Sequence, residues 1–151
     1  MSKLSSKPVL KKILIAILVF VIVSVGVVWF VFTDTYSDTA KEKSAFTVSV
    51  ASLIKEFEGD LAVANKKYTE QVITVNGRVG EIENADAIIN IKMIDTTSGS
   101  YAIFAFQAKD MDKVKQVKEG DSLSIKGSCS GGAYSDILET HFINFKRCAI
   151  N

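Results

Sequence analysis

A long run of hydrophobic residues lies near the start of the chain. Residues 13–32 read ILIAILVFVIVSVGVVWFVF, twenty residues without a charge, interrupted only by Ser24 and Gly26. At about 1.5 Å rise per residue, a helix of this length spans roughly the 30 Å hydrocarbon core of a bilayer. A buried helix of a small globular domain would be apolar on one side only. The run therefore predicts a transmembrane helix that contacts membrane lipid through residues 13–32.

The charges on either side of the run predict its orientation. The preceding residues, 1–12, contain no acid and four lysines: Lys3, Lys7, Lys11 and Lys12. Because lysines are retained on the cytoplasmic side, we expect a single-pass protein of the cytoplasmic membrane, with its C-terminal part periplasmic or extracellular. A cleaved signal peptide is the alternative. Its apolar core usually has only about 7–15 residues, and no A-x-A-like cleavage site follows the run.

Helical spacing follows a polar stretch. Residues 33–48 are polar and mixed in charge, and they predict a juxtamembrane tether. From Ser49 onward a helix is expected, with Ser49 as its N-cap and Gly59 as its end. The apolar stripe of this helix consists of Val50, Leu53, Ile54 and Phe57. A second short helix is expected over residues 60–67, where it presents Leu61, Val63 and Ala64.

The spacing of apolar residues then changes to every second position, which is typical of half-buried strands. In residues 71–83 one side carries Ile73, Val75, Gly77 and Val79, and the other carries Thr74, Asn76 and Arg78. Turns are expected at residues 84–86 and 95–100. Further strands are expected at 89–93, 101–106 and 141–150, with a short helical connector at 110–117. In residues 118–130 a turn at 119–121 is expected before a strand that carries Leu123, Ile125, Gly127 and Cys129 on one side.

Three strands, a helical connector and two more strands predict a mainly β domain over residues 49–151. This order is typical of a five-stranded OB-type Greek-key barrel, here preceded by short helices. The alternative is an open antiparallel sheet that packs against those helices.

The composition of the chain narrows the range of possible functions. The chain has 151 residues, 18 Lys and Arg, 17 Asp and Glu, one His and two Cys. Without the four N-terminal lysines, 14 basic and 17 acidic residues remain, so the net charge of the exported part is −3. Such a domain is poorly suited to a phosphate backbone, because nonspecific affinity depends on neutralising phosphates. A single histidine excludes a histidine-rich metal site.

Several short motifs resemble those of a known protein family. They are Asn65-Lys66-Lys67-Tyr68, VITVNGRV at 72–79, Lys118-Glu119-Gly120-Asp121, Ile125-Lys126-Gly127-Ser128-Cys129 and the terminal Arg147-Cys148-Ala149-Ile150. Over residues 49–151 this order resembles the tRNA_anti-like family of small extracytoplasmic OB-fold domains. The resemblance implies an OB fold and a membrane or lipoprotein habit. It does not imply tRNA binding, because the family name records a structural likeness.

The two cysteines form the candidate disulfide. Cys129 and Cys148 both follow the apolar run, and exported compartments permit disulfides. A hairpin centred at Leu138 and Glu139 would place them opposite each other. A hairpin at Gly131 and Gly132 would hold them apart, whereas a disulfide needs Cα atoms within about 7 Å. We expect a disulfide, with two buried free thiols as the alternative.

Catalytic chemistry finds little support. His141 is the one imidazole, and its neighbour Glu139 does not complete a nucleophile–base–acid arrangement. Asp110 and Asp112 lack the glycine and the final glutamate of a calcium loop, and we expect them to cap the connector helix. The sequence therefore predicts no enzyme, no metal site and no cofactor.

A ligand-binding face remains as the candidate site. OB domains bind ligands on the second and third strands and on the loops between strands one and two and between four and five. The residues expected there are Arg78, Asn90, Lys92, Tyr101 and Tyr134. We expect a binding or envelope-assembly module whose partner is a protein or an envelope polymer. The alternatives are a single-stranded nucleic-acid-binding domain and a solvated barrel wall without a ligand.

Overall fold

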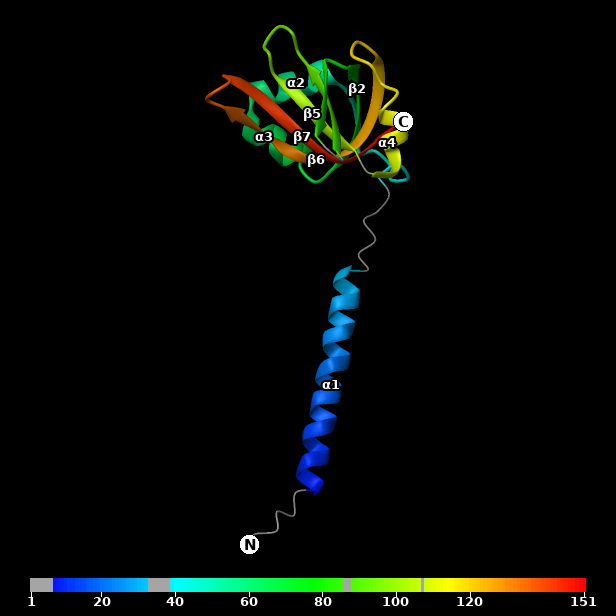
Figure 1. Cartoon of the computed structure of the whole chain (residues 1–151). Helices are drawn as coiled ribbons and strands as arrows, with labels where there is room; N and C mark the ends of the chain where they lie inside the picture. The colour runs from blue at the N-terminus through cyan, green and yellow to red at the C-terminus, as the bar shows by residue number, and fades with distance from the viewer. Residues whose placement is uncertain (1–6, 33–38, 86–87, 107) are drawn as a thin grey trace. The chain divides into compact units, whose positions relative to one another are not determined.

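The computed structural model describes residues 7–32, 39–85, 88–106 and 108–151, and in the first helix it describes side chains from residue 12 to residue 27. The chain divides into two units, Met1–Tyr36 and Ser37–Asn151. Figure 1 shows the elements in chain order: α1 Lys7–Phe32, β1 Phe46–Ser49, α2 Val50–Gly59, α3 Leu61–Tyr68, β2 Val72–Arg78, β3 Glu81–Ala85, β4 Ile88–Ile94, β5 Tyr101–Phe106, η1 Ala108–Asp110, α4 Met111–Val114, β6 Ser122–Ser135 and β7 Thr140–Ile150.

The first unit contains the 26-residue helix α1. Its large apolar side chains are exposed, for example Phe20 at 74% and Ile22 at 62%. The hydroxyl of Ser24 donates a hydrogen bond to the Phe20 carbonyl at 2.8 Å, so this polar group is satisfied inside the helix. Within the described part of the chain, no helix has the length and hydropathy of a membrane span.

Helices α2 and α3 form as the apolar spacing predicts. The Ser49 hydroxyl accepts from the Ser52 amide at the start of α2, and the Asp60 carboxylate accepts from the Val63 amide at the start of α3. α2 buries Leu53, Ile54 and Phe57, whereas α3 buries Ala64 and Tyr68. Val63 was expected on the apolar side of its helix but is 61% exposed, because the buried side of α3 runs through Ala64 and Tyr68 instead.

The strands form a mainly β, OB-like arrangement. Their order in the sheet is β1-β2-β6-β7-β5-β4-β3, and all neighbours are antiparallel except β1–β2 and β5–β7. Only Val79 and Gly80 separate β2 from β3, so these two strands form one bent strand. Its first half pairs with β6 and its second half pairs with β4. The predicted strand over residues 71–83 is therefore broken at this bend. The predicted turn at 84–86 starts too early, because Asn84 still pairs in β3, and Asp86 lies outside the described residues.

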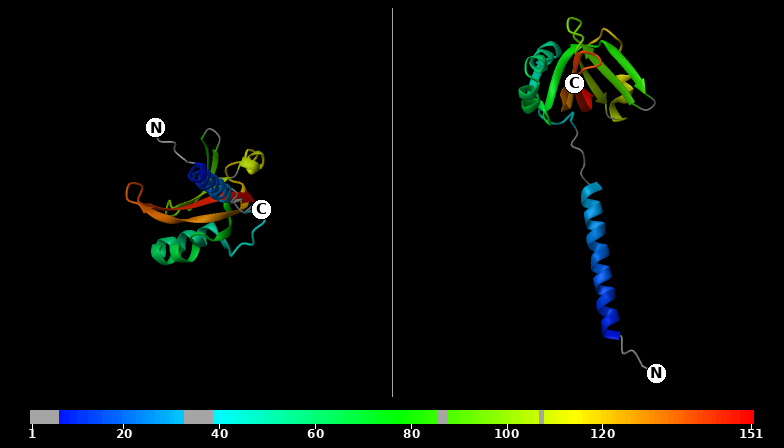
Figure 2. Two further views of the ribbon diagram at one scale, coloured as in Figure 1. Left: turned by 90° about the horizontal axis from the view of Figure 1, so that it is seen from below. Right: turned by 90° about the vertical axis from the view of Figure 1, so that its left-hand side faces the viewer.

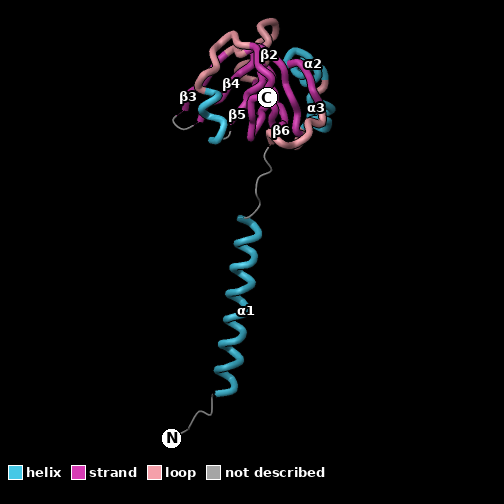
Figure 3. Tube along the Cα trace, turned by 90° about the vertical axis from the view of Figure 1, so that its right-hand side faces the viewer, coloured by secondary structure: helices cyan, strands magenta, loops and turns pink. Residues whose placement is uncertain are grey.

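The core lies between the strands and the helices. α2 contacts β1, β2, β5 and β7, while α3 contacts β6. The views in Figures 2 and 3 show α2 and α3 together on one side of the strands and α4 on another. Phe104 of β5 and Phe145 of β7 stack at 4.8 Å between ring centroids, and Val114 of α4 is buried in the same core. Burial of these side chains supplies the main driving force for folding.

The edge segment, residues 39–49, contains a strand that the pattern did not predict. β1 pairs in parallel with β2, in the register Phe46↔Ile73 to Ser49↔Asn76. The Lys126 ammonium donates to the carbonyls of Ala40 and Glu42 at 3.2 and 3.1 Å. From Thr39 onward, the residues expected to be tether therefore pack on the domain. Thr74, expected on the polar side of its strand, is buried beneath this segment and hydrogen-bonds to Ser44.

The last two strands form a long hairpin with a turn at residues 136–139. The turn is centred between Ile137 and Leu138, one residue before the centre that would place the cysteines opposite each other, and Gly131 and Gly132 lie inside β6. Two register shifts interrupt the pairing, one between Lys126 and Ser128 and one between Cys129 and Gly131. β-Bulges of this kind increase the local bend of a strand and leave residues without a direct partner.

Candidate ligand-binding face

The candidate face is the outer surface of β3, β4, β5 and β7. On β4, Ile91 and Met93 are buried in the core, so the alternating residues Asn90, Lys92 and Ile94 point outward. On β5, burial of the even-numbered residues leaves Tyr101 and Ile103 on the outer side. The structure thus brings Asn90, Lys92 and Tyr101 to one face.

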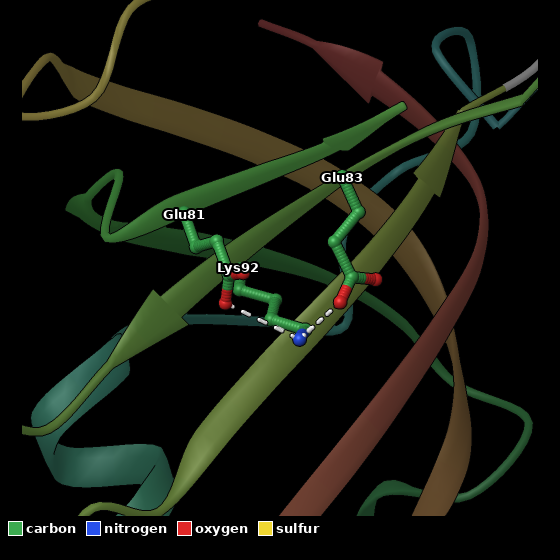
Figure 4. A network of polar contacts seen from close by, with 3 residues as sticks. All are labelled: Glu81, Glu83 and Lys92. Atoms are coloured by element: carbon green, nitrogen blue, oxygen red, sulfur yellow. Dashed lines mark hydrogen bonds and ion pairs between the residues drawn. The ribbon is translucent and has the colours of Figure 1, made fainter. Parts of the chain in front are cut away.

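Lys92 is held by two carboxylates of the neighbouring strand. Its Nζ donates to Glu81 Oε2 at 3.3 Å and to Glu83 Oε1 (Figure 4). The hydrogen bond to Glu83 is the largest cause that raises the pKa of Lys92 above its ordinary value. The lysine side chain is only 17% exposed, against 49% for Glu81 and 42% for Glu83. One cation with two carboxylates gives this part of the face a net charge of −1.

An aromatic pair lies beside this network. Tyr101 of β5 is paired in register with Phe142 of β7, and their rings are nearly parallel, with 6.3 Å between centroids and 22° between planes. The Lys92 Nζ is 5.4 Å from the Tyr101 ring centroid, within the range of a cation–π interaction. Both rings are partly exposed. Phe142 was missed in the sequence, although inward-facing Ile143 and Phe145 imply that it points outward.

A pocket borders the face at the bend between β2 and β3. It has a volume of about 530 Å³ and is lined by Arg78, Val79, Gly80, Ile94, Thr96 and Gly120. Arg78 is exposed, and its Nε donates to the Gly120 carbonyl at 3.1 Å. Ile94 also pairs with Tyr101 across β4 and β5, so the pocket and the aromatic pair are adjacent.

Asn90 and Tyr134 contribute differently from what was expected. Asn90 pairs with Glu83 and Ala105, and its Oδ1 is buried without a hydrogen-bond partner among the described residues. In the β6–β7 hairpin Ala133 pairs with Phe142 and Tyr134 with the next residue, His141. Because neighbouring residues of a strand face opposite sides, Tyr134 lies on the face opposite the aromatic pair. Its ring contacts His141 at 4.9 Å.

The cysteines are buried and free. The register shifts place Cys129 opposite Phe145, and the Cys148 sulfur lies over Gly127. The two residues are therefore displaced along neighbouring strands rather than opposite each other, and the expected disulfide is not formed in the structure. Burial is the largest cause that raises the pKa of both thiols.

The remaining polar candidates have structural contacts. The amide of His141 donates to Ser100 Oγ at 3.2 Å, and that hydroxyl donates to Glu58 Oε1 at 2.7 Å, which ties β7 to α2. Asp110 makes no side-chain cap, contrary to expectation, because at the end of η1 its backbone is helical (φ −97°, ψ −3°) rather than extended as at an N-cap. Asp112 is exposed in the first turn of α4. In the described ranges, no group of three or more His, Cys, Asp or Glu side chains could hold a metal ion.

Comparisons with known proteins agree with this fold. The sequence model of the tRNA_anti-like family matches residues 1–139, so the match starts before the expected residue 49 and includes the apolar run. A search of curated proteins finds no match. A solved lipoprotein from Klebsiella pneumoniae, whose name ascribes nucleic-acid binding to it, aligns with a TM-score of 0.53 and 18% identity over 70% of this chain and 90% of that chain.

Two further solved structures align less well. OBody AM3L09, solved bound to hen egg-white lysozyme, has a TM-score of 0.45 and 12% identity, over 61% of this chain and 89% of that chain. The asparaginyl-tRNA synthetase of Entamoeba histolytica has a TM-score of 0.38 and 19% identity. This alignment covers 54% of this chain and 20% of the synthetase.

Proposed function

Since the chain belongs to the tRNA_anti-like family, we propose that it is a single-pass membrane protein that presents a noncatalytic OB-like binding module outside the cytoplasmic membrane. The membrane part of the proposal is supported by the uncharged run at 13–32 and by the four lysines that precede it. The exposed apolar side chains of α1 agree with it, because such a surface needs an apolar environment.

The binding part of the proposal depends on one observation. The pocket beside Arg78 and the aromatic pair Tyr101–Phe142 are adjacent on the outer face, connected by Ile94. A concave site with an apolar wall and few polar groups is typical of ligand binding. The partly exposed rings provide contact area, and Arg78 provides a directional donor.

The orientation is tested with two reporters fused at Asn151 of the full chain. One reporter is active only outside the cytoplasm and the other only inside it. The external reporter should be active and the internal one inactive, and the fusion should stay in the membrane fraction after alkaline washing. Activity of the internal reporter would overturn the external location.

Binding is tested in living cells with a photo-reactive amino acid at Tyr101 of the full chain. The matched control carries it at Val63, which is 61% exposed on α3. The proposal expects a discrete adduct from position 101 and none from position 63. Equal labelling from both positions, or no adduct from position 101, would contradict a binding role for this face.

Single-stranded nucleic acid is the second candidate. It is favoured by the position of Arg78 and Tyr101 on one OB-like face, since such proteins combine stacking rings with basic side chains. Pairing of Lys92 with two carboxylates counts against it. With the full chain in detergent micelles, fluorescence anisotropy should detect no binding of labelled oligonucleotides at tens of micromolar and low salt. Salt-sensitive binding that Arg78→Gln abolishes would favour this candidate.

A further inference from the structure

The charge of the outer face restricts the chemistry of its ligand. Lys92 is mostly buried between Glu81 and Glu83, whose carboxylates are about half exposed. A polymer with an anionic group on each unit would bring its charges against these carboxylates, and like charges at short range repel. The face therefore suits a chain whose units are mostly uncharged.

The remaining groups suit sugar units. Sugar rings present apolar C–H surfaces that can pack on aromatic rings, and Tyr101 and Phe142 provide two nearly parallel rings. Sugar hydroxyls are hydrogen-bond donors, and the exposed carboxylate oxygens of Glu81 and Glu83 are acceptors. The apolar side chains of a hydrophobic peptide would offer these carboxylates no donor.

The Arg78 pocket adds one charged position. The Nε atom of Arg78 donates a hydrogen bond to the Gly120 carbonyl. The two terminal nitrogens of the guanidinium have no hydrogen-bond partner among the described residues. A guanidinium with free donors binds a carboxylate through two parallel hydrogen bonds. The pocket volume of about 530 Å³ is within the range of small-molecule sites. Ile94 separates this position from Tyr101 by a single cross-strand pair.

Building on the proposed binding function, we propose that the outer face binds an envelope glycan of mostly uncharged sugars that carries isolated carboxylates. One carboxylate binds Arg78 in the pocket, and a neighbouring sugar packs on Tyr101 and Phe142. This assignment goes beyond the proposed function because it specifies the chemical class of the ligand and the role of each residue.

Calorimetric titration of the full chain in detergent micelles tests this assignment with three probes. The first is an uncharged tetramer of N-acetylglucosamine. The second is the same backbone with a lactyl carboxylate on alternate sugars, and the third is a single-stranded oligothymidine. The carboxylated glycan should bind at least about tenfold more tightly than the uncharged one, because charged hydrogen bonds contribute more than neutral ones. The oligothymidine should not bind.

Three variants and one control separate the roles of the residues. Arg78→Gln should lose about tenfold affinity for the carboxylated glycan only, whereas Lys66→Gln, which removes one positive charge on exposed α3, should change nothing. Tyr101→Leu should weaken the binding of both glycans about tenfold or more, since leucine keeps an apolar side chain at this position but loses the ring. The double variant Glu81→Gln, Glu83→Gln should gain oligothymidine binding because Lys92 is freed. Thermal unfolding confirms that each variant is folded.

The outcomes separate this inference from the function on which it rests. If position 101 gives an adduct in cells but neither glycan binds the purified chain, the binding function stands and the glycan assignment is wrong. Equal affinity for the two glycans, or an Arg78→Gln loss that is the same for both, would overturn the role of the pocket. Binding of oligothymidine by the unmodified chain would overturn the assignment as a whole.

Discussion

Gly132 is a residue whose side chain is limited by its neighbours. A Cβ atom there would lie 2.6 Å from Phe57 Cδ1 and 3.1 Å from the Phe142 carbonyl oxygen. Gly132→Ala should therefore lower the free energy of unfolding by about 1–3 kcal/mol through overpacking. Urea unfolding measures this change.

The matched control is Gly59→Ala at the end of α2, where an added Cβ meets no atom within 4 Å. This change should be neutral or stabilise by up to about 1 kcal/mol, because alanine favours the helix. Equal effects of the two substitutions would contradict the packing of α2 against the β6–β7 hairpin.

Glu56 links α2 and α3 and predicts a pH dependence. Its carboxylate accepts from the Lys67 Nζ at 2.7 Å and from the buried Tyr68 hydroxyl at 2.9 Å. The hydrogen bond from Lys67 is the largest cause that lowers the pKa of Glu56 below its ordinary value of 4.5. The ionised form is thus favoured in the folded state, so its contribution to stability is present above pH 4.5 and is lost as the pH falls through the lower folded pKa.

Glu56→Gln removes this contribution. The difference in free energy of unfolding between the unmodified chain and this variant should shrink as the pH is lowered from about 7 to about 3. Urea unfolding at several pH values measures it, with Glu119→Gln in the exposed turn at 118–121 as the control. A difference that stays constant over this range would show that the carboxylate charge does not matter.

Residue positions were predicted best where burial follows simple alternation. Asn90, Lys92 and Tyr101 were expected on one face and lie there. Tyr134 was assigned to the same face because it is near the loop between the last two strands, but its side is set by its pairing with His141. The ion pairs that neutralise Lys92 depend on the register of β3 against β4, which a single strand pattern does not reveal.

At the scale of elements, Lys126 holds the edge segment against the barrel. Lys126→Met removes its hydrogen bonds to the carbonyls of Ala40 and Glu42. Amide hydrogen exchange in residues 39–49 should become about tenfold faster, while the amides of β7 should be unchanged, because local opening depends on local contacts. Lys146→Met, which removes an exposed ion pair with Glu70, should leave the edge segment unaffected.

Helices and long strands were predictable because apolar residues repeat within each of them at the spacing of a helix or of a strand. α2, α3, β4, β5 and β7 lie where the pattern places them. β1 was not predicted because its four residues, FTVS, follow a charged stretch, and its strand conformation comes from pairing with β2. The register of β6 against β7 was also not predictable. The pairing of Ser135 with Thr140 centres the turn between Ile137 and Leu138, and this position displaces Cys129 from Cys148. The two bulges, one at Ser130 of β6 and one at residues 147–148 of β7, depend on contacts of the folded sheet.

At the scale of the whole molecule, the two units predict that residues 37–151 fold by themselves. This fragment should unfold in one cooperative transition and keep the secondary structure of the barrel, as measured by circular dichroism. A fragment of residues 50–151 lacks β1 and the contact of Phe46 with Tyr68 at 5.3 Å. It should be less stable by about 2 kcal/mol or more and prone to aggregation, since the β2 edge is exposed. Equal stability of the two fragments would contradict the role of the edge segment.

The mainly β, OB-like fold was predictable at this scale because the order of strands and helical connector is characteristic. The bend between β2 and β3 was not predictable, because it depends on pairing of β2 with β6 and of β3 with β4.

The position of β7 has a consequence for how the protein is made. Of the seven strands of this sheet, these eleven residues leave the ribosome after the other six, yet they lie between β6 and β5 in the middle of the sheet. Until they emerge, no strand lies between β6 and β5, and β1-β2-β6 and β5-β4-β3 are connected only through the bent β2–β3 strand, so the edges of β6 and β5 stay unpaired during synthesis. An open chain can be threaded through a narrow translocation channel. A premature stop before residue 140 would leave the edges of β6 and β5 without the strand that pairs with both, instead of a slightly weakened barrel.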